Sequence, residues 1–205
     1  MGSCSVPEEP INQYALVTYL PDELGAFLDQ MRRDLVANCK ARSHLSLLPP
    51  RALQVSPHIA EAQIQHMSLT AQPFAVKIGG VAVFPRTSVV YLELECGKTE
   101  IEGLHQQLAM EALQFDEPYP FHPHVTLAQN FDLETVAERL EQARQRWQSY
   151  RGPREFLLDR VVFVQNSTNN CWIDLRSFSL KGMPVAAAPP TQPLFTSTIH
   201  SNILS

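Results

Sequence analysis

Charged residues are scarce in this chain, and a surplus of positive charge is missing. Charged side chains make up 18% of the 205 residues, and 16 Lys and Arg stand against 21 Asp and Glu, which leaves a net charge of −5. A chain without a positive surplus has no global field for gripping long nucleic acid by its phosphates. We therefore expect any nucleic-acid partner to be small, or to be held by one end in a local pocket.

Membrane and export signals are also missing. Apolar runs such as residues 161–164 are too short to cross a bilayer, and the N-terminus lacks the basic start and apolar core of a secretory signal. The four cysteines include no Cys-x-x-Cys pair, so we expect reduced thiols rather than a zinc knuckle or a dense disulfide framework. These absences favour a soluble cytoplasmic protein that has no membrane partner.

The apolar content is that of a globular protein. A hydrophobic share of 44% in 205 residues fits one globular domain, for which we expect the bounds 11–182. Residues 1–10 are polar and contain proline, and residues 183–205 are rich in Pro and Ala with almost no charge. We expect the first segment to be a flexible lead-in and the last to be a tail.

A duplicated motif stands out against this background. His124 and Thr126 lie two apart in a run that is otherwise apolar and is typical of a strand. Because alternate strand residues share a face, these two side chains should point the same way. Residues 43–48 repeat the pattern with His44 and Ser46. The duplication predicts two similar lobes, each of which contributes one histidine and one hydroxyl to a shared cleft.

A third copy of the motif is interpreted as a decoy. His66 heads the tetrad His-Met-Ser-Leu, but it lies in a segment with helical spacing. In a helix, residues two apart point about 200° away from each other around the axis, so His66 and Ser68 cannot act together on one group. We expect His66 to be a partly exposed helix residue.

Hydrophobic periodicity predicts a mixture of helices and antiparallel strands. Helical spacing covers residues 21–39, 56–67, 99–113 and 133–150. Strand patterns cover residues 14–20, 44–48, 74–78, 89–94, 156–164 and 171–178, and a polar turn joins the last two as a hairpin. The order of elements in the first half echoes that in the second. We therefore expect an α+β fold in which antiparallel sheets are flanked by helices and two lobes meet over an active-site cleft.

The two strand motifs together resemble the two-histidine (2H) phosphoesterase superfamily, which includes bacterial 2′-5′ RNA ligase-like proteins and cyclic nucleotide phosphodiesterases. The resemblance extends over roughly residues 12–180. It implies a pseudo-symmetric two-lobed fold, with His44, Ser46, His124 and Thr126 as the catalytic and phosphate-binding residues. Ser46 stands where Thr is commoner in the family, but it keeps the hydroxyl group.

The chemistry that the resemblance implies suits these side chains. Opening a 2′,3′-cyclic phosphate needs a base for the attacking oxygen and an acid for the leaving ribose oxygen, and imidazoles titrate near the working pH. The hydroxyls can donate hydrogen bonds to the non-bridging phosphate oxygens. Such an enzyme, hydrolase or ligase, needs no metal or other cofactor. Its substrates would be small nucleotides or RNA ends with 2′,3′-cyclic phosphates or 2′-5′ bonds, and we expect it to be a monomer.

Residues near the motifs are weaker candidates for substrate binding. Arg51 follows a rigid Pro-Pro pair and could clamp a phosphate, although a solvated loop arginine fits the sequence equally well. Tyr119 and Phe121 precede the second motif and could stack on a base. For at least one of the two rings, core packing is favoured over base stacking.

Two other functions fit the same residues. In a metal-dependent hydrolase, His122 and His124 would bind zinc from one strand, with His44, Asp116 or Glu117 as the third ligand. In a module without catalytic activity, the cleft would only recognise phosphorylated ends. The presence of both motif histidines favours the two-histidine phosphoesterase.

Overall fold

Two antiparallel sheets form the frame of the protein. The computed structural model describes residues 9–37, 39–129 and 133–182. In this part of the chain, sheet A has the order β2-β1-β7-β8, and sheet B has the order β5-β4-β3-β6. The strands of sheet A are β2 (His44–Arg51), β1 (Pro10–Tyr19), β7 (Arg160–Ser167) and β8 (Ile173–Ser179). Those of sheet B are β5 (Val125–Ala128), β4 (Val90–Cys96), β3 (Phe74–Val83) and β6 (Glu155–Leu158).

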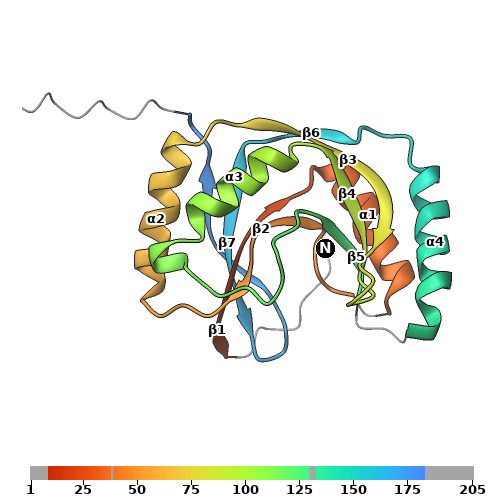
Figure 1. Ribbon diagram of the computed structural model, residues 1–205, viewed down its shortest axis with the longest axis horizontal. Helices are drawn as coiled ribbons and strands as arrows, with labels where there is room; N and C mark the ends of the chain where they lie inside the picture. Colours follow the sequence, from red (N-terminus) through yellow and green to blue (C-terminus); the bar gives the residue numbers. More distant parts are fainter. Residues whose placement is uncertain (1–8, 38, 130–132, 183–205) are drawn as a thin grey trace, which may run out of the picture.

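Each sheet is covered on one face by a pair of helices. Helices α2 (Pro57–Thr70) and α3 (Lys98–Leu108) pack on sheet A, and α1 (Asp22–Leu35) and α4 (Val136–Ser149) pack on sheet B. Short 3₁₀ turns occupy Glu111–Leu113 and Leu133–Thr135. Figure 1 shows the two helix pairs on opposite sides of the molecule, with β2 and β5 between them. The predicted α+β fold with two lobes is confirmed.

No described helix is both long and apolar enough to cross a membrane. Helix α1, for example, buries only one of its faces. Its residues Leu24, Leu28, Met31 and Leu35 recur at helical spacing and are at most 5% exposed. The helix ends at Leu35, before the expected residue 39, because Val36 adopts an extended backbone.

The lobes do not follow the two halves of the sequence. Strands β1 and β2 pair with β7 and β8 from the other end of the chain, while α1, which lies between β1 and β2 in sequence, packs on sheet B. Most of the buried hydrophobic residues of both lobes form one continuous cluster, and Ala15, Val17, Val162 and Val164 form a smaller one. The two lobes are therefore interleaved along the chain and cannot fold as separate sequence halves.

One predicted strand is in fact two strands in two sheets. The expectation of a single strand over residues 156–164 is wrong, because β6 in sheet B ends at Leu158 and β7 in sheet A begins at Arg160. The burial pattern explains the break. Asp159 and Arg160 are both exposed, whereas Leu158 and Val161 on either side are buried, so the alternation of the strand loses its phase there. The hairpin of β7 and β8 is confirmed.

The third histidine motif lies in a helix, as predicted. His66 and Ser68 both belong to α2. His66 is exposed, whereas Ser68 is completely buried and donates its hydroxyl hydrogen to the backbone oxygen of Gln65 at 2.8 Å. The two side chains therefore point in different directions and cannot share a substrate.

The cysteines correct another expectation. Cys171 is disulfide-bonded, so the expectation of reduced thiols is wrong for this residue. Cys39 and Cys96 are free.

Arg51 lies in the interior and not at a phosphate site. Its side chain is 1% exposed, and its guanidinium donates hydrogen bonds to the Leu113 backbone oxygen at 2.8 Å and to Oε1 of Glu117 at 2.5 Å. The third guanidinium nitrogen, Nε, donates to the backbone oxygen of Pro49 at 3.1 Å. The structure therefore corrects the expectation that Arg51 could clamp a phosphate. Arg51 instead ties the end of β2 to the segment that leads into β5.

The buried ion pair generates a prediction about stability. Replacing Arg51 with Leu should lower the free energy of unfolding by about 3 kcal/mol or more, because Glu117 would keep its negative charge in a mostly buried place without its cation. Urea unfolding measures the change. Adding Glu117→Gln to the Arg51→Leu variant should recover part of the loss, since the uncompensated charge is removed.

A surface pair provides the matched control. Lys77 and Glu95 also form an ion pair at 2.6 Å, but their side chains are 39% and 57% exposed. Lys77→Leu should therefore change the free energy of unfolding far less than Arg51→Leu does. Equal losses in Arg51→Leu and Lys77→Leu would show that the buried pair does not hold the structure together.

Candidate functional site

The two motif histidines lie where the two sheets meet. β2 is an edge strand of sheet A and β5 is an edge strand of sheet B, and the two strands pack against each other (Figure 1). His44 is the first residue of β2, and His124 immediately precedes β5. Positive charge on His124 lowers the pKa of His44, an interaction that requires the two rings to be near each other. The structure thus brings together residues far apart in the sequence.

Both motifs show the predicted strand alternation. In each motif the histidine and the hydroxyl residue are partly exposed. The apolar residues that alternate with them are at most 1% exposed, namely Leu45, Leu47, Val125 and Leu127. The four polar side chains therefore point away from the helices, toward the faces of the sheets that the helices leave uncovered. Neither the Ser46 nor the Thr126 hydroxyl is hydrogen-bonded to a described residue, so both are available to a ligand.

The two imidazole rings are held in the same way. Nδ1 of His44 lies 2.7 Å from the backbone oxygen of Arg42, and Nδ1 of His124 lies 2.6 Å from that of His122. A carbonyl oxygen only accepts, so Nδ1 carries the proton when the ring is neutral. Nε2 then has a free lone pair, and it makes no hydrogen bond to any described residue. Each ring therefore presents Nε2 for proton transfer.

The pKa of His44 is strongly lowered. Burial of the ring in the protein is the main cause, and it lowers the pKa from 6.5 to about 4. The bond to the carbonyl of Arg42 acts in the opposite direction, Arg32 and His124 lower the pKa further, and Asp29 raises it. His44 is therefore neutral at pH 7 in the free protein and can accept a proton.

The pKa of His124 is lowered as well, again mainly by burial. The bond to the carbonyl of His122 raises this pKa, and charge on the His122 ring lowers it. Burial thus favours the neutral form of both rings.

Helix α1 supplies two site residues that the sequence analysis missed. Oδ1 of Asp29 accepts a hydrogen bond from the backbone N–H of Ser43 at 2.5 Å, directly before His44. One turn later, the Arg32 guanidinium donates from Nη1 to the backbone oxygen of Thr126. Arg32 is 5% exposed, and its Nε is buried without a hydrogen-bond partner in the described structure. On the sequence alone, Asp29 and Arg32 look like a solvated pair beside an apolar stripe, so no local signal distinguishes them.

Aromatic rings fill the side of the site next to His124. The ring centroids of Phe84 and Tyr91 lie 5.0 and 5.3 Å from that of His124, and the two rings stack on each other at 4.0 Å. Both rings also contact His122, at 5.3 and 5.7 Å. His122 therefore packs in a wall of rings beside the site.

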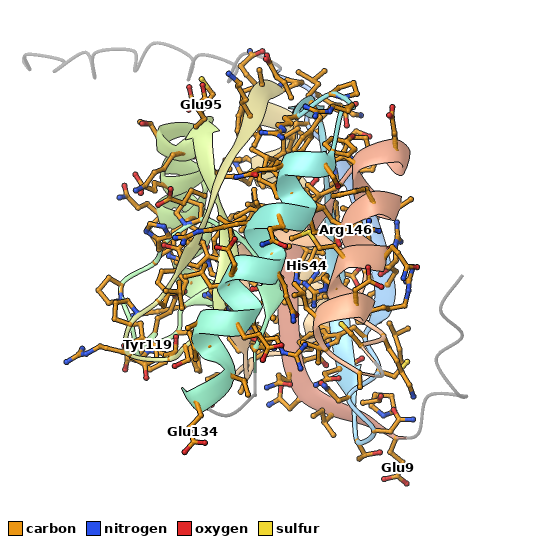
Figure 2. The ribbon with its side chains drawn as sticks, turned by 90° about the vertical axis from the view of Figure 1, so that its right-hand side faces the viewer. Glu9, His44, Glu95, Tyr119, Glu134 and Arg146 are labelled. Atoms are coloured by element: carbon orange, nitrogen blue, oxygen red, sulfur yellow. The ribbon has the colours of Figure 1, made fainter. Side chains whose placement is uncertain are left out.

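Tyr119 and Phe121, expected to bind a base, occupy different places. Phe121 is half-buried and stacks on His105 at 3.7 Å with parallel rings, and His105 Nδ1 lies 2.8 Å from the backbone oxygen of Leu47. Tyr119 is 54% exposed. Figure 2 shows it at the outer edge of the molecule, whereas His44 lies near the middle of the view. Neither ring is brought to the motif histidines by a contact in the structure.

The zinc alternative lacks a complete set of ligands in the described structure. No group of three or more His, Cys, Asp or Glu side chains among the described residues is arranged to hold a metal ion. Of the expected third ligands, Glu117 is paired with Arg51. The pair of His122 and His124 has centroids 6.3 Å apart, with the rings of Phe84 and Tyr91 packed beside both.

Comparison with known families gives one match that covers most of the chain. The profile of the 2′-5′ RNA ligase superfamily matches residues 20–170, which contain both histidine motifs. Among curated relatives, the "Putative phosphoesterase BH1439" of Halalkalibacterium halodurans is 21% identical over 168 residues, which cover 77% of this chain and 95% of the relative. A similarly named protein of Bacillus licheniformis is 27% identical over 141 residues, covering 67% and 79%.

Solved structures share the fold at low sequence identity. The protein TT0787 of Thermus thermophilus superposes with a TM-score of 0.58 at 19% identity, covering 83% of this chain and 98% of its own. E. coli LigT in complex with 3′-AMP gives a TM-score of 0.59 at 17% identity, covering 84% and 99%. LigT has also been solved with NADP+ and with ATP.

The charges on α1 make a prediction about the titration of His44. By NMR, the His44 ring should titrate near pH 4 in the free protein. Arg32→Gln should raise this pKa because a nearby positive charge is removed. Asp29→Asn is the matched control of opposite sign: it keeps an oxygen for the Ser43 N–H but removes a negative charge, so it should lower the pKa. Shifts in the same direction for both variants would show that the charges of α1 do not act on His44.

Proposed function

Because the chain belongs to the 2′-5′ RNA ligase superfamily, we propose that it is a metal-independent phosphoesterase whose acid and base are His44 and His124. Its substrates are nucleotides or RNA ends that carry a 2′,3′-cyclic phosphate or a 2′-5′ phosphodiester bond. The observation that carries the proposal is the matched pair of Nδ1-to-carbonyl contacts on adjacent edge strands, which leaves Nε2 of both rings free. Two such nitrogens provide one acceptor and one donor for protons.

In the hydrolytic direction, His44 acts as the base. Its Nε2 takes a proton from water as the water oxygen forms a bond to phosphorus. One of the two ester bonds of the cyclic phosphate breaks, and protonated His124 gives its Nε2 proton to the departing ribose oxygen. The product is a nucleoside monophosphate. The strongly lowered pKa of His44 supports this assignment, because a ring with a pKa of about 4 is neutral and able to accept a proton at pH 7. In ligation the two roles are exchanged.

The hydroxyl groups act on the phosphate oxygens. Ser46 and Thr126 each lie two residues after a histidine on the same face of the strand, so each can donate a hydrogen bond to a non-bridging oxygen beside that histidine. Arg32 does not need to touch the substrate. Its bond to the Thr126 backbone oxygen keeps the second motif in place relative to α1.

The fold relatives support a small nucleotide as the ligand. LigT, which shares this fold, has been solved with 3′-AMP, ATP and NADP+. This chain carries no positive surplus that would hold a long polynucleotide, since its net charge is −5. A single nucleotide or the end of an RNA chain fits both observations.

Mutation of the motifs tests the proposal. Purified protein is assayed against 2′,3′-cyclic nucleotides and 2′-5′-linked dinucleotides in excess chelator. His44→Ala and His124→Ala should each abolish turnover, and Ser46→Ala and Thr126→Ala should each cost about 1–3 kcal/mol of transition-state stabilisation. His66→Ala is the matched control, because His66 heads the same tetrad in an exposed position on a helix. It should retain full activity.

The alternatives give different results in the same assay. Activity that disappears with chelator and returns with zinc would support the metal-dependent hydrolase. Ligand binding without turnover would support the module that only recognises phosphorylated ends. Loss of activity in His66→Ala to the same extent as in His44→Ala would contradict the assignment of the site.

The lowered pKa values predict the pH profile. In the free enzyme, kcat/KM should rise above pH 4 as His44 loses its proton and should fall before pH 6.5 as His124 loses its own. A bound phosphate is negative and favours the protonated rings, so both limbs of the kcat profile should lie at higher pH than those of kcat/KM. Steady-state kinetics from pH 3.5 to 9 measures both. An acid limb of kcat/KM at or above pH 6.5 would contradict the role of His44 as the base.

A further inference from the structure

A pocket of about 660 Å³ lies beside His44 on the uncovered face of sheet A. Its position follows from the strand register. Tyr19 of β1, which lines the pocket, is the pairing partner of His44. Val162 of β7, also in the lining, pairs with Val17, which in turn pairs with Ser46. Directly paired residues on neighbouring strands share a face, so the pocket floor continues the surface that carries the first motif.

The volume of the pocket is that of a site for an organic ligand. Pockets for small molecules and cofactors usually have about 300–1,000 Å³, whereas a phosphate group alone needs far less. The reacting phosphate itself belongs at the histidines and hydroxyls. The additional space at Tyr19 must therefore serve another part of the ligand.

Rings line the other side of the site. The rings of Phe84, Tyr91 and His122 pack together next to His124. A substrate that extends beyond the reacting phosphate has room over sheet A, whereas these rings occupy the described surface next to His124. The site is pseudo-symmetric in its histidines but asymmetric in its surroundings.

The lining of the pocket suits a nucleoside. The Arg42 guanidinium carbon lies 3.7 Å from the centre of the Tyr19 ring, and the Tyr19 hydroxyl donates to Oδ1 of Asp174 at 2.5 Å. The Arg42 side chain is 59% exposed, so the outer face of its planar guanidinium is open to a further ring. Bases stack on aromatic rings and on arginine planes. Arg160 and Arg176 add two further cations to a lining that also contains the carboxylates of Asp159 and Asp174.

Apolar side chains complete the surface. Leu157 and Leu175 are among the most exposed large hydrophobic residues in the described structure, at 59% and 38%, and both line this pocket. They add apolar surface to a lining that also contains arginines. A nucleobase has apolar faces, and it is joined through its ribose to a negatively charged phosphate. A nucleotide therefore matches this combination of apolar and cationic surfaces.

We propose that this pocket binds the second nucleoside of the substrate, so that the preferred substrates are at least dinucleotides. The base stacks on the open face of Arg42, which itself lies over Tyr19, and Arg160 faces the phosphate that joins the two nucleosides. The backbone oxygen of Arg42 also accepts the hydrogen bond from Nδ1 of His44. The short segment 42–44 therefore contacts the nucleobase through the Arg42 side chain and positions the reacting centre through His44. This subsite rests on the proposed function, because it requires the scissile phosphate to lie at His44 and His124.

The test compares two substrates that carry the same reacting group. They are adenosine 2′,3′-cyclic phosphate and the dinucleotide adenylyl-adenosine ending in a 2′,3′-cyclic phosphate. The wild-type protein should prefer the dinucleotide in kcat/KM. Arg42→Gln and Tyr19→Leu should each reduce this preference about tenfold, mainly by raising KM for the dinucleotide, because each removes part of the surface on which the base stacks. Arg146→Gln is the matched control and should leave the preference unchanged, because Arg146 lies on α4 with a side chain 45% exposed and pairs with Asp34 of α1.

Two results would overturn the subsite. One is a wild-type protein that shows no preference for the dinucleotide. The other is an equal loss for both substrates in Arg42→Gln and Tyr19→Leu, which would mean that these residues act only through His44 or the fold.

A binding experiment separates the subsite from the proposed function. If the wild-type protein turns over neither substrate, the proposed function fails. Calorimetric titration with adenylyl-adenosine, which has no cyclic phosphate, still tests the pocket. The wild-type protein should bind it, and Arg42→Gln should weaken the binding about tenfold. No binding by the wild-type protein, or equal binding by both proteins, would reject the subsite irrespective of turnover.

Discussion

Two charged side chains of α1 hold the two histidine motifs in one arrangement. β2 and β5 belong to different sheets, so no ladder of backbone hydrogen bonds fixes one motif relative to the other in the described structure. Asp29 binds the N–H before His44, and Arg32 binds the carbonyl of Thr126, one helical turn apart on a single helix. A rigid helix thus sets the relative position of the two strands. Proton transfer depends on that position, because a displacement of about 1 Å can cost a hundredfold in rate.

The interleaving of the two lobes strengthens this arrangement. Sheet A is built from both ends of the chain, while α1 leaves sheet A to cover sheet B. A second connection between β2 and the segment before β5 is the buried pair of Arg51 and Glu117. Since a single hydrophobic cluster runs through both lobes, opening the cleft widely would expose core residues. The structure therefore favours a preorganised site over one that closes by a large movement of the lobes.

Burial of the histidines decides their chemistry as much as their position does. The two rings share the same contact with a backbone carbonyl, and burial lowers the pKa of both, that of His44 to about 4. Their surroundings differ: Arg32 lowers the pKa of His44 further, while the rings of Phe84 and Tyr91 pack beside His124. A pocket lies over the strands of sheet A next to His44. A duplicated motif can in this way assign different roles to its two copies.

The sequence by itself determined the elements whose signals are local. The alternation of His44 and Ser46 with Leu45, and of His124 and Thr126 with Val125, was sufficient to predict both strands and their exposed faces, and helical spacing correctly set His66 apart. Burial of a charged residue is decided by distant parts of the chain. In the sequence, Arg51 and Arg32 look like ordinary surface arginines. In the structure both are interior residues: Arg51 pairs with Glu117, which is 66 positions away, and Arg32 donates to the backbone oxygen of Thr126, which is 94 positions away. Only the tertiary structure could decide these contacts. It also decided that one predicted strand divides between two sheets at Asp159, and that a pocket forms at Tyr19. Each of these features arises from packing between segments that are far apart in the sequence.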